Sequence, residues 1–457
     1  MKLYNTMTQQ VEQFVPLEPG KVKIYTCGPT VYNYAHIGNL RTYVSEDILV
    51  RSLRFLGYEV IRAMNVTDVG HLESDADEGE DKMLKGARRE RKTVWQIADY
   101  YTDVFFQDME KLHLQKPDIV MRATDQIDEY IEFIQVLQDK GYAYQAGGNI
   151  YYDVSKFPDY TKLSRMPLEN LQHGSRGEVS LDENKRNPYD FALWFTKSKF
   201  DDQEMKWDSP FGRGYPGWHL ECSVISLKAL GEQLDIHCGG VDHISTHHTN
   251  EIAQTESYTG RKWVNYWWHA EFLITDEGRM SKSKGGFLSL SRLQELGYDP
   301  MDYKYFLLGS HYRKQLMFSD EGMDSARTAY QKLKERTLAL EEAIETEAYL
   351  DQFKAALADD LNTANALTLL YAVLKDDSLK SGEKRYIIQQ MDTVLGLDLF
   401  REKEHDLDVE TIERLIAERN AAKSEKNWAR ADEIRQQLID MGISIMDGKD
   451  GTTWKVN

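Results

Sequence analysis

The spacing of apolar residues changes several times along the chain, and each change predicts a different element. Residues 21–30, KVKIYTCGPT, combine β-branched and aromatic side chains and end in Gly28-Pro29, which indicates a buried strand and a turn. From residue 35, apolar side chains recur at helical spacing as far as Gly57, a residue type that commonly ends helices. Residues 59–69, EVIRAMNVTDV, predict a second strand. Strand, helix and strand in this order form a βαβ unit, so we expect an α/β fold with a doubly wound parallel sheet.

Apolar spacing typical of helices and composition typical of strands both return further along the chain. Residues 216–231 and the segment that begins at residue 247 predict helices, whereas residues 232–240 and 263–275 predict strands. Beyond about residue 295 the pattern is almost wholly helical until a turn-rich tail. Two stretches lack a clear period: residues 165–212, which are polar, and residues 70–90, which predict an exposed loop leading into a helix.

Composition narrows the class of protein. The 457 residues are typical of about three domains. A net charge of −19 opposes non-specific attraction to nucleic acid and to anionic membranes, so any nucleic-acid function must rest on motifs. No apolar run is long enough to span a bilayer, and the first residues carry no targeting pattern. Three scattered cysteines are too few for a disulfide framework, so we expect a reduced, cytoplasmic protein without a membrane partner.

Two short motifs suit a bound polyphosphate. AHIGN, residues 35–39, lies between a strand and a helix, where free backbone N–H groups and the helix dipole favour phosphate; His36 offers a donor and Gly38 allows close approach. RMSKSKGG, residues 279–286, places lysines among small residues, as suits a mobile loop that brings ammonium groups to phosphate. Taken singly, each motif has an ordinary alternative, a capped turn in the first case and a solvated basic loop in the second.

In order along the chain, the two motifs resemble the signature pair of class I aminoacyl-tRNA synthetases. Within that class the chain resembles cysteinyl-tRNA synthetases from about residue 20 to its C-terminus, through YTCGPTVYNYAHIGN, RFLGYEVIRAMNVTDV, PGWHLECSVIS, LDIHCGG, HHTNEIAQTE, VNYWWHAEF, RMSKS, FKAALADDLNTANAL, WARADEIRQQLIDMGI and DGTTW. The resemblance implies a ligase that activates L-cysteine with ATP to cysteinyl-adenylate and transfers it to tRNA-Cys. Mg²⁺ would arrive with ATP, and no obligate protein partner is evident.

The domain organisation follows from the same resemblance. We expect a Rossmann-like catalytic domain interrupted by an insertion, then a helical bundle and a small terminal module. The expected ranges are 1–115 and 213–295 for the two catalytic halves, 116–212 for the connective insertion, 296–400 for the bundle on the tRNA side, and 401–457 for the anticodon-recognition module.

A zinc site is implied by the resemblance, with Cys27, Cys222, His247 and Glu251 as ligands. The chemistry agrees: His247 and Glu251 are four residues apart, on one face of the predicted helix, and two thiolates, an imidazole and a carboxylate suit Zn²⁺. Because a soft thiolate is a better additional ligand than a hydroxyl, the metal can distinguish cysteine from serine, and we expect no editing domain. A merely structural zinc is the alternative. Cys238 stands where the family has glycine, and we favour a buried residue over an extra ligand.

Other site residues are carried over by motif position. His36, Gly38 and Asn39 would hold ATP, with Asn39 standing where many members have a second histidine, and Lys282 would stabilise the departing pyrophosphate, with Lys284 as a helper. The residues implied around cysteine are Gly28, Thr67, Trp218, His219 and Asp242, and those implied at the anticodon are Trp428, Asp432 and Asp447. Ordinary alternatives are a core aromatic for Trp218, a strand-end cap for Asp242 and a solvated helix pair for the tail.

Two other functions share part of this pattern. A ligase that joins cysteine to an amino-sugar has the same catalytic core but lacks the terminal module, so the WARAD…DGTTW tail argues against it. A non-catalytic RNA-binding paralogue would not need intact HIG, MSKS and metal-ligand positions. The segment at 70–80 has the character of an insertion, and no role for it follows from the sequence.

Overall fold

The structure is a computed structural model that describes residues 1–70, 82–168, 183–197, 204–275, 278–279, 288–401, 409–441, 443–448 and 451–456. It forms two compact units, Met1–Phe400 and Arg401–Asn457. None of the described helices combines the length and the apolar run that a membrane-spanning segment requires.

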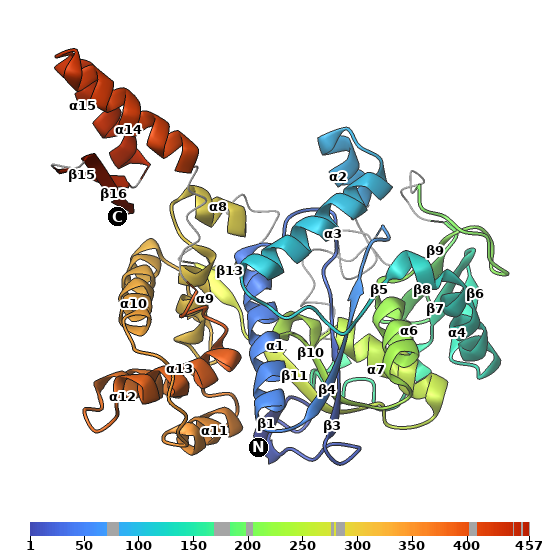
Figure 1. Cartoon of the computed structure of the whole chain (residues 1–457). Coiled ribbons are helices and arrows are strands. Elements are labelled where there is room, and N and C mark those ends of the chain that lie inside the picture. The colour runs from blue at the N-terminus through green and yellow to red at the C-terminus, as the bar shows by residue number, and fades with distance from the viewer. Residues whose placement is uncertain are drawn as a thin grey trace. The chain divides into compact units, whose positions relative to one another are not determined.

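A five-stranded parallel sheet lies at the centre of the first unit (Figure 1). All of its neighbouring strands pair in parallel, which confirms the predicted doubly wound α/β fold. The strand order is β11 (Val264–Ala270), β10 (Leu234–Gly240), β3 (Lys21–Thr26), β4 (Glu59–Val66) and β5 (Ile119–Arg122).

Helices cover both faces of this sheet, because successive side chains of a strand point to opposite sides. Ile24 of β3 packs in one apolar cluster with Leu49 and Leu53 of α1 (Ile37–Phe55). Tyr25, the next residue, packs in another with side chains of α6 (Trp218–Leu230) and α7 (His247–Thr259). Figure 1 shows α1 on one side of the sheet and α6 and α7 on the other. The result is a three-layer α/β/α arrangement.

Two described helices connect β4 to β5, and the segment between β5 and β10 carries further helices and a separate antiparallel sheet. Trp194 and Phe191 of this second sheet pack in one apolar cluster with side chains of α4, α6 and α7. Strand β8 lies inside the polar stretch that the sequence left unassigned, where FALWF is wholly buried. The elements are α2 (Lys82–Glu90), α3 (Val94–Lys111), η1 (Ala123–Gln126), α4 (Ile127–Asp139), β6 (Ala143–Ala146), β7 (Asn149–Tyr152), η2 (Val154–Lys156), β8 (Phe191–Phe195) and β9 (Tyr215–Pro216).

The rest of the first unit is mainly helical, as the apolar spacing predicts. These helices share one large apolar cluster with the start of α1. The elements are η3 (Val241–His243), β12 (Leu273–Thr275), β13 (Gly278–Arg279), α8 (Leu290–Glu295), α9 (Pro300–Leu308), β14 (Leu316–Met317), α10 (Asp320–Leu338), α11 (Leu350–Ala358), α12 (Thr363–Lys375) and α13 (Ser381–Leu395). An N-terminal hairpin, β1 (Lys2–Asn5) and β2 (Gln10–Gln13), was not expected from the sequence.

The second unit is a helix pair followed by a hairpin. Its elements are α14 (Val409–Ser424), α15 (Trp428–Asp440), β15 (Ile443–Gly448) and β16 (Gly451–Val456), the two strands being antiparallel. Ile412, Ile434, Leu438 and Ile443 form a small core of their own.

Candidate metal centre and nucleotide-binding turn

Four residues implied as metal ligands come together where β3 ends. Cys27 directly follows β3, Cys222 lies in α6, and His247 and Glu251 occupy the first turns of α7. The Sγ atoms of Cys27 and Cys222 are 3.8 Å apart, and His247 Nε2 lies 3.4 Å from Cys222 Sγ and 3.0 Å from Glu251 Oε1. The fourth side of the group, from Cys27 Sγ to Glu251 Oε1, measures 4.0 Å. All four side chains are buried.

These separations suit a single small cation. A tetrahedral zinc with bonds of about 2.0–2.3 Å requires ligand atoms about 3.3–3.8 Å apart. The four measured separations, 3.0–4.0 Å, bracket that range. Two sulfur donors favour zinc over the hard cations Mg²⁺ and Ca²⁺, which prefer oxygen. The residues present therefore fit a zinc ion.

A second ligand-like set shares two members with the first. His237 and His248 lie with Cys27 and Glu251 in a group that also has the separations of a metal site. His237 Nε2 is 2.7 Å from Glu251 Oε2, and His248 Nε2 is 3.3 Å from Cys27 Sγ. Since the first set contains both thiols, these two histidines are better understood as partners that orient its ligands. Neither histidine was predicted as a site residue from the sequence; the available signal was a histidine inside the apolar strand LDIHCGG and a second one in HHTNE.

Burial sets the protonation of this group. It raises the pKa of the Cys27 and Cys222 thiols and of the Glu251 carboxyl, because a charged form loses its hydration. Burial, with repulsion from neighbouring histidines, lowers the pKa of His248 and His269. Burial alone favours the protonated thiols, whereas a bound cation favours the thiolates. Binding of a divalent metal should therefore release protons.

Two of the residues implied around cysteine contact the metal group directly. Trp218 stacks on the His247 ring with centroids 4.4 Å apart, and His219 Nδ1 lies 2.9 Å from His247 Nδ1. The Thr67 hydroxyl donates to Glu221 Oε2 at 2.7 Å. Asp242 lies in η3, directly after β10.

Asn65 of β4 hydrogen-bonds to Gly28 and Thr67, two of the residues implied around cysteine, and was not predicted from the sequence. Its Oδ1 accepts from the Gly28 N–H at 2.7 Å and from the Tyr25 hydroxyl at 3.1 Å, and its Nδ2 donates to Thr67 Oγ1 at 2.9 Å. Gly28 is needed here for space, because a Cβ at this position would lie 1.6 Å from the Asn65 carbonyl oxygen. The one available signal was a polar residue in the buried part of a strand.

The HIGN motif forms the turn between β3 and α1. His36 is the N-cap of α1, and its Nδ1 accepts from the Asn39 N–H at 3.0 Å. The Ile37 N–H donates to the Leu288 carbonyl at 2.8 Å, and His36 bridges to Ser289. The structure thus brings His36, Gly38 and Asn39 together. Lys282 and Lys284 lie outside the described residues. Leu288, the first described residue after them, contacts this turn through its carbonyl.

Cys238 is not part of either ligand set. Its side chain is fully buried with Val22, Ile24 and Leu49, in the apolar layer between the sheet and α1. It is a core residue in this structure.

The three residues implied at the anticodon lie in the second unit. Trp428 begins α15 with 60% of its surface exposed, and Asp432 is exposed one turn further along the same helix. Asp447 of β15 accepts from both Arg419 guanidinium nitrogens at 2.9 Å and from Lys423 Nζ at 2.5 Å. These bonds lower the pKa of Asp447, whose carboxylate ties the hairpin to α14.

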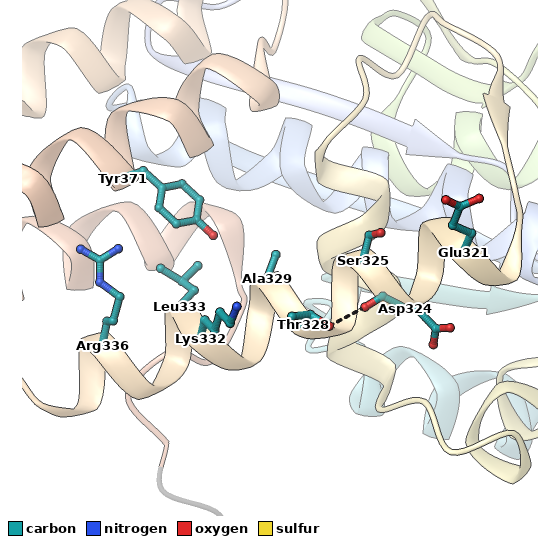
Figure 2. A pocket seen from close by; sticks show the side chains of 9 residues that line it. All are labelled: Glu321, Asp324, Ser325, Thr328, Ala329, Lys332, Leu333, Arg336 and Tyr371. Carbon is teal, nitrogen blue, oxygen red and sulfur yellow. Dashed lines mark hydrogen bonds between the residues drawn. The ribbon is translucent and has the colours of Figure 1, made fainter.

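A groove of about 860 Å³ is lined by none of these residues (Figure 2). Figure 2 shows it along one side of α10, with Tyr371 opposite and with acidic and basic side chains toward different ends. The groove contains no cluster of metal-binding groups among its lining residues: Glu321, Asp324, Ser325, Thr328, Ala329, Lys332, Leu333, Arg336 and Tyr371.

Comparison with known proteins identifies relatives over the whole chain. Residues 13–328 match the family described as tRNA synthetases class I (C) catalytic domain, and residues 406–454 match the cysteinyl-tRNA ligase anticodon binding domain. The cysteine–tRNA ligase of Treponema denticola is 48% identical over 100% of this chain and 99% of its own length. Those of Treponema pallidum and Borrelia turicatae are 43% and 42% identical, with the same coverage.

Solved structures show the same fold at low identity. A Mycobacterium tuberculosis methionyl-tRNA synthetase bound by methionyl-adenylate has a TM-score of 0.55 and 15% identity, covering 82% of this chain and 90% of its own. A LeuRS–tRNA–LeuAMS complex from Agrobacterium radiobacter has a TM-score of 0.57 and 11% identity, covering 84% and 85%.

Proposed function

The chain belongs to the cysteine–tRNA ligase family, and from that premise we propose that Cys27, Cys222, His247 and Glu251 hold a zinc ion by which the enzyme distinguishes cysteine from serine. The enzyme is a ligase whose substrates are cysteine, ATP and tRNA. The observation that carries the proposal is the buried group of two thiols, one imidazole and one carboxylate, whose ligand atoms all lie within 4.8 Å of one another. When bound, the zinc supplies an additional coordination position that a substrate thiolate fills better than a hydroxyl.

The side chains around this group are suited to orienting the amino acid. Trp218, stacked on His247, closes one side of the space beside the ligands. Thr67 and His219 are buried and offer polar groups, while Gly28 leaves the end of β3 without a side chain. Asp242, at the start of η3, is proposed to receive the substrate ammonium group. Such fixed groups reduce the entropy that substrate and catalyst lose on alignment.

Adenylate formation requires no protein nucleophile. The carboxylate of cysteine attacks the α-phosphorus of Mg-ATP, and pyrophosphate leaves. His36, Gly38 and Asn39, at the N-terminus of α1, are proposed to hold the triphosphate, where the helix dipole favours negative charge. Lys282 is proposed to stabilise the departing pyrophosphate. Five residues separate Lys282 from Leu288, and such a span reaches at most about 20 Å, so the turn lies within range.

The second unit is proposed to bind the anticodon of tRNA-Cys. An exposed Trp428 can stack on an unpaired base, and Asp432 can accept hydrogen bonds from base edges. Asp447 carries two roles in this proposal, since its ion pair with Arg419 also fixes the hairpin. In the transfer step, a terminal ribose hydroxyl of the tRNA attacks the carbonyl carbon of cysteinyl-adenylate, an ester forms, and AMP leaves with its phosphate oxygen. The amino-sugar ligase is disfavoured, because residues 406–454 match an anticodon binding domain.

Metal analysis of two cysteine variants tests the zinc proposal. We expect about one zinc per chain in the purified enzyme, and loss of most of it in Cys222→Ala. Cys238→Ala is the matched control, since Cys238 is equally buried but belongs to neither ligand set. Cysteine-dependent ATP–pyrophosphate exchange should fall with the zinc in the first variant and persist in the second. Full zinc retention in Cys222→Ala would overturn the ligand assignment.

A further inference from the structure

The N-terminal hairpin brings one threonine to the metal group. Thr6 follows β1, and its N–H donates to the Trp267 carbonyl at 2.8 Å. Asn5 fixes the same strand, accepting from the Trp267 N–H at 3.1 Å and donating to the Asn265 carbonyl at 3.0 Å. Thr6 is 8% exposed, so its hydroxyl has little access to water. The residue lies outside the matched catalytic family range and outside every motif considered above.

From Thr6 a line of three contacts ends at Cys27. Thr6 Oγ1 lies 2.8 Å from His269 Nδ1, and His269 Nε2 lies 2.8 Å from His248 Nδ1. His248 Nε2 is then 3.3 Å from Cys27 Sγ. All four residues are buried, and both nitrogens of both rings take part.

Hydrogen-bond chemistry fixes the direction of this line when a metal is bound. A neutral imidazole has one donor and one acceptor nitrogen. A metal-bound Cys27 is a thiolate, which only accepts, so His248 must carry its proton on Nε2. His248 Nδ1 then accepts from His269 Nε2–H, which leaves His269 Nδ1 as an acceptor in need of a donor. The Thr6 hydroxyl is the group placed to supply it.

We propose that Thr6 is a positioning residue: its hydroxyl holds His269 and His248 in the tautomers that direct an N–H at the Cys27 thiolate. The inference rests on the proposed zinc site. An N–H···S bond orients Cys27 and stabilises its buried thiolate, which is the form that binds the metal.

Histidine tautomers in the unmodified enzyme give the first test. With ¹⁵N-labelled histidine, NMR of the zinc-loaded enzyme should show His248 and His269 both protonated on Nε2. A zinc-loaded enzyme in which His248 is protonated on Nδ1 overturns the proposal without any variant.

Variants of Thr6 give the second test. Thr6→Val keeps the shape and removes the hydroxyl, whereas Thr6→Ser restores it. We expect Thr6→Val to lose about 10- to 100-fold in zinc affinity, measured by chelator competition, and Thr6→Ser to remain close to the unmodified enzyme. The thiolate-to-metal charge-transfer band of the cobalt-substituted enzyme should shift in Thr6→Val alone.

A control on the same hairpin separates this effect from a loss of folding. Thr8 hydrogen-bonds to Asn5 and Glu12 and is exposed, so Thr8→Val perturbs the hairpin without reaching the histidines. Equal zinc affinity and an equal cobalt spectrum in Thr6→Val and the unmodified enzyme refute the role of Thr6 and leave the zinc site standing. Retention of zinc by Cys222→Ala instead refutes the zinc site itself.

Discussion

Replacing Asn65 by alanine should weaken both the fold and the binding of cysteine. The Asn65 side chain accepts from the Gly28 N–H and the Tyr25 hydroxyl and donates to Thr67. Gly28 and Thr67 are both proposed to border the substrate. Removing the amide therefore leaves two donors without an acceptor, next to the proposed pocket.

The structure sets the size of the effect. Tyr25, Asn65 and Thr67 are at most 2% exposed, so water does not replace the lost acceptor without rearrangement. A buried donor left unsatisfied costs about 1–3 kcal/mol. The Tyr25 hydroxyl is such a donor, whereas the Gly28 N–H is only partly buried, so the free energy of unfolding should fall by about 1–3 kcal/mol. Urea-induced unfolding measures this change. In ATP–pyrophosphate exchange, KM for cysteine should rise about tenfold or more, which corresponds to about 1.4 kcal/mol of binding.

Asn149→Ala is the matched control. Asn149 is also buried, and its Oδ1 accepts from the Thr196 and Lys197 N–H groups, each at 2.9 Å, but it lies in the antiparallel sheet. It should lose a similar amount of stability with an unchanged KM for cysteine. If both variants lose stability equally and neither changes KM, the proposed link between Asn65 and the substrate is refuted.

Three further predictions concern other parts of the chain. Lys282→Ala should sharply reduce the rate of pyrophosphate exchange with little change in cysteine affinity, because its charge matches the transition state; an unchanged rate would move that role to Lys284. Trp428→Ala should weaken tRNA binding by about 1–3 kcal/mol, measured as a raised KM for tRNA, and leave ATP–pyrophosphate exchange unchanged; equal loss of both activities would count against an anticodon role. Burial raises the pKa of Glu46 to about 8 from its ordinary 4.5, against the effect of Arg62. Between those values the folded chain keeps a proton that the unfolded chain has lost, so stability should fall as pH rises, by up to about 1.4 kcal/mol per unit. Glu46→Gln should flatten this fall in urea midpoints, and an identical slope in both proteins would contradict it.

The central sheet was predictable because its evidence is local. KVKIYTC and EVIRAMNV have the composition of buried strands, and the helix between them shows its own periodicity and terminal glycine. The N-terminal hairpin was not predicted, because its strands, Lys2–Asn5 and Gln10–Gln13, have only four residues each and no regular alternation of apolar and polar residues. FALWF lies between polar stretches that hide its strand character.

The residues of the candidate site also fall into those that local spacing could predict and those that only the fold brings together. His247 and Glu251 are four residues apart, so helical geometry alone places them on one face. Cys27 and Cys222 are 195 residues apart, and only a family resemblance could join them before the fold was known. Asn65, His237, His248 and Thr6 act through hydrogen bonds to distant side chains, which leave no spacing in the sequence.

The topology explains why the metal group and the nucleotide turn occupy neighbouring positions. From β3 the chain proceeds to β4 and β5 on one side and later returns to β10 and β11 on the other, so the order of the sheet reverses between β3 and β10. In doubly wound sheets, ligands bind at such a point, beyond the carboxyl ends of the strands. Cys27 ends β3 at this position, and His36 starts α1 nine residues later. In the proposed function, a thiol held at the metal group and a triphosphate held at the start of α1 would therefore meet beyond the end of one strand, which is the arrangement that attack by a carboxylate on the α-phosphorus requires.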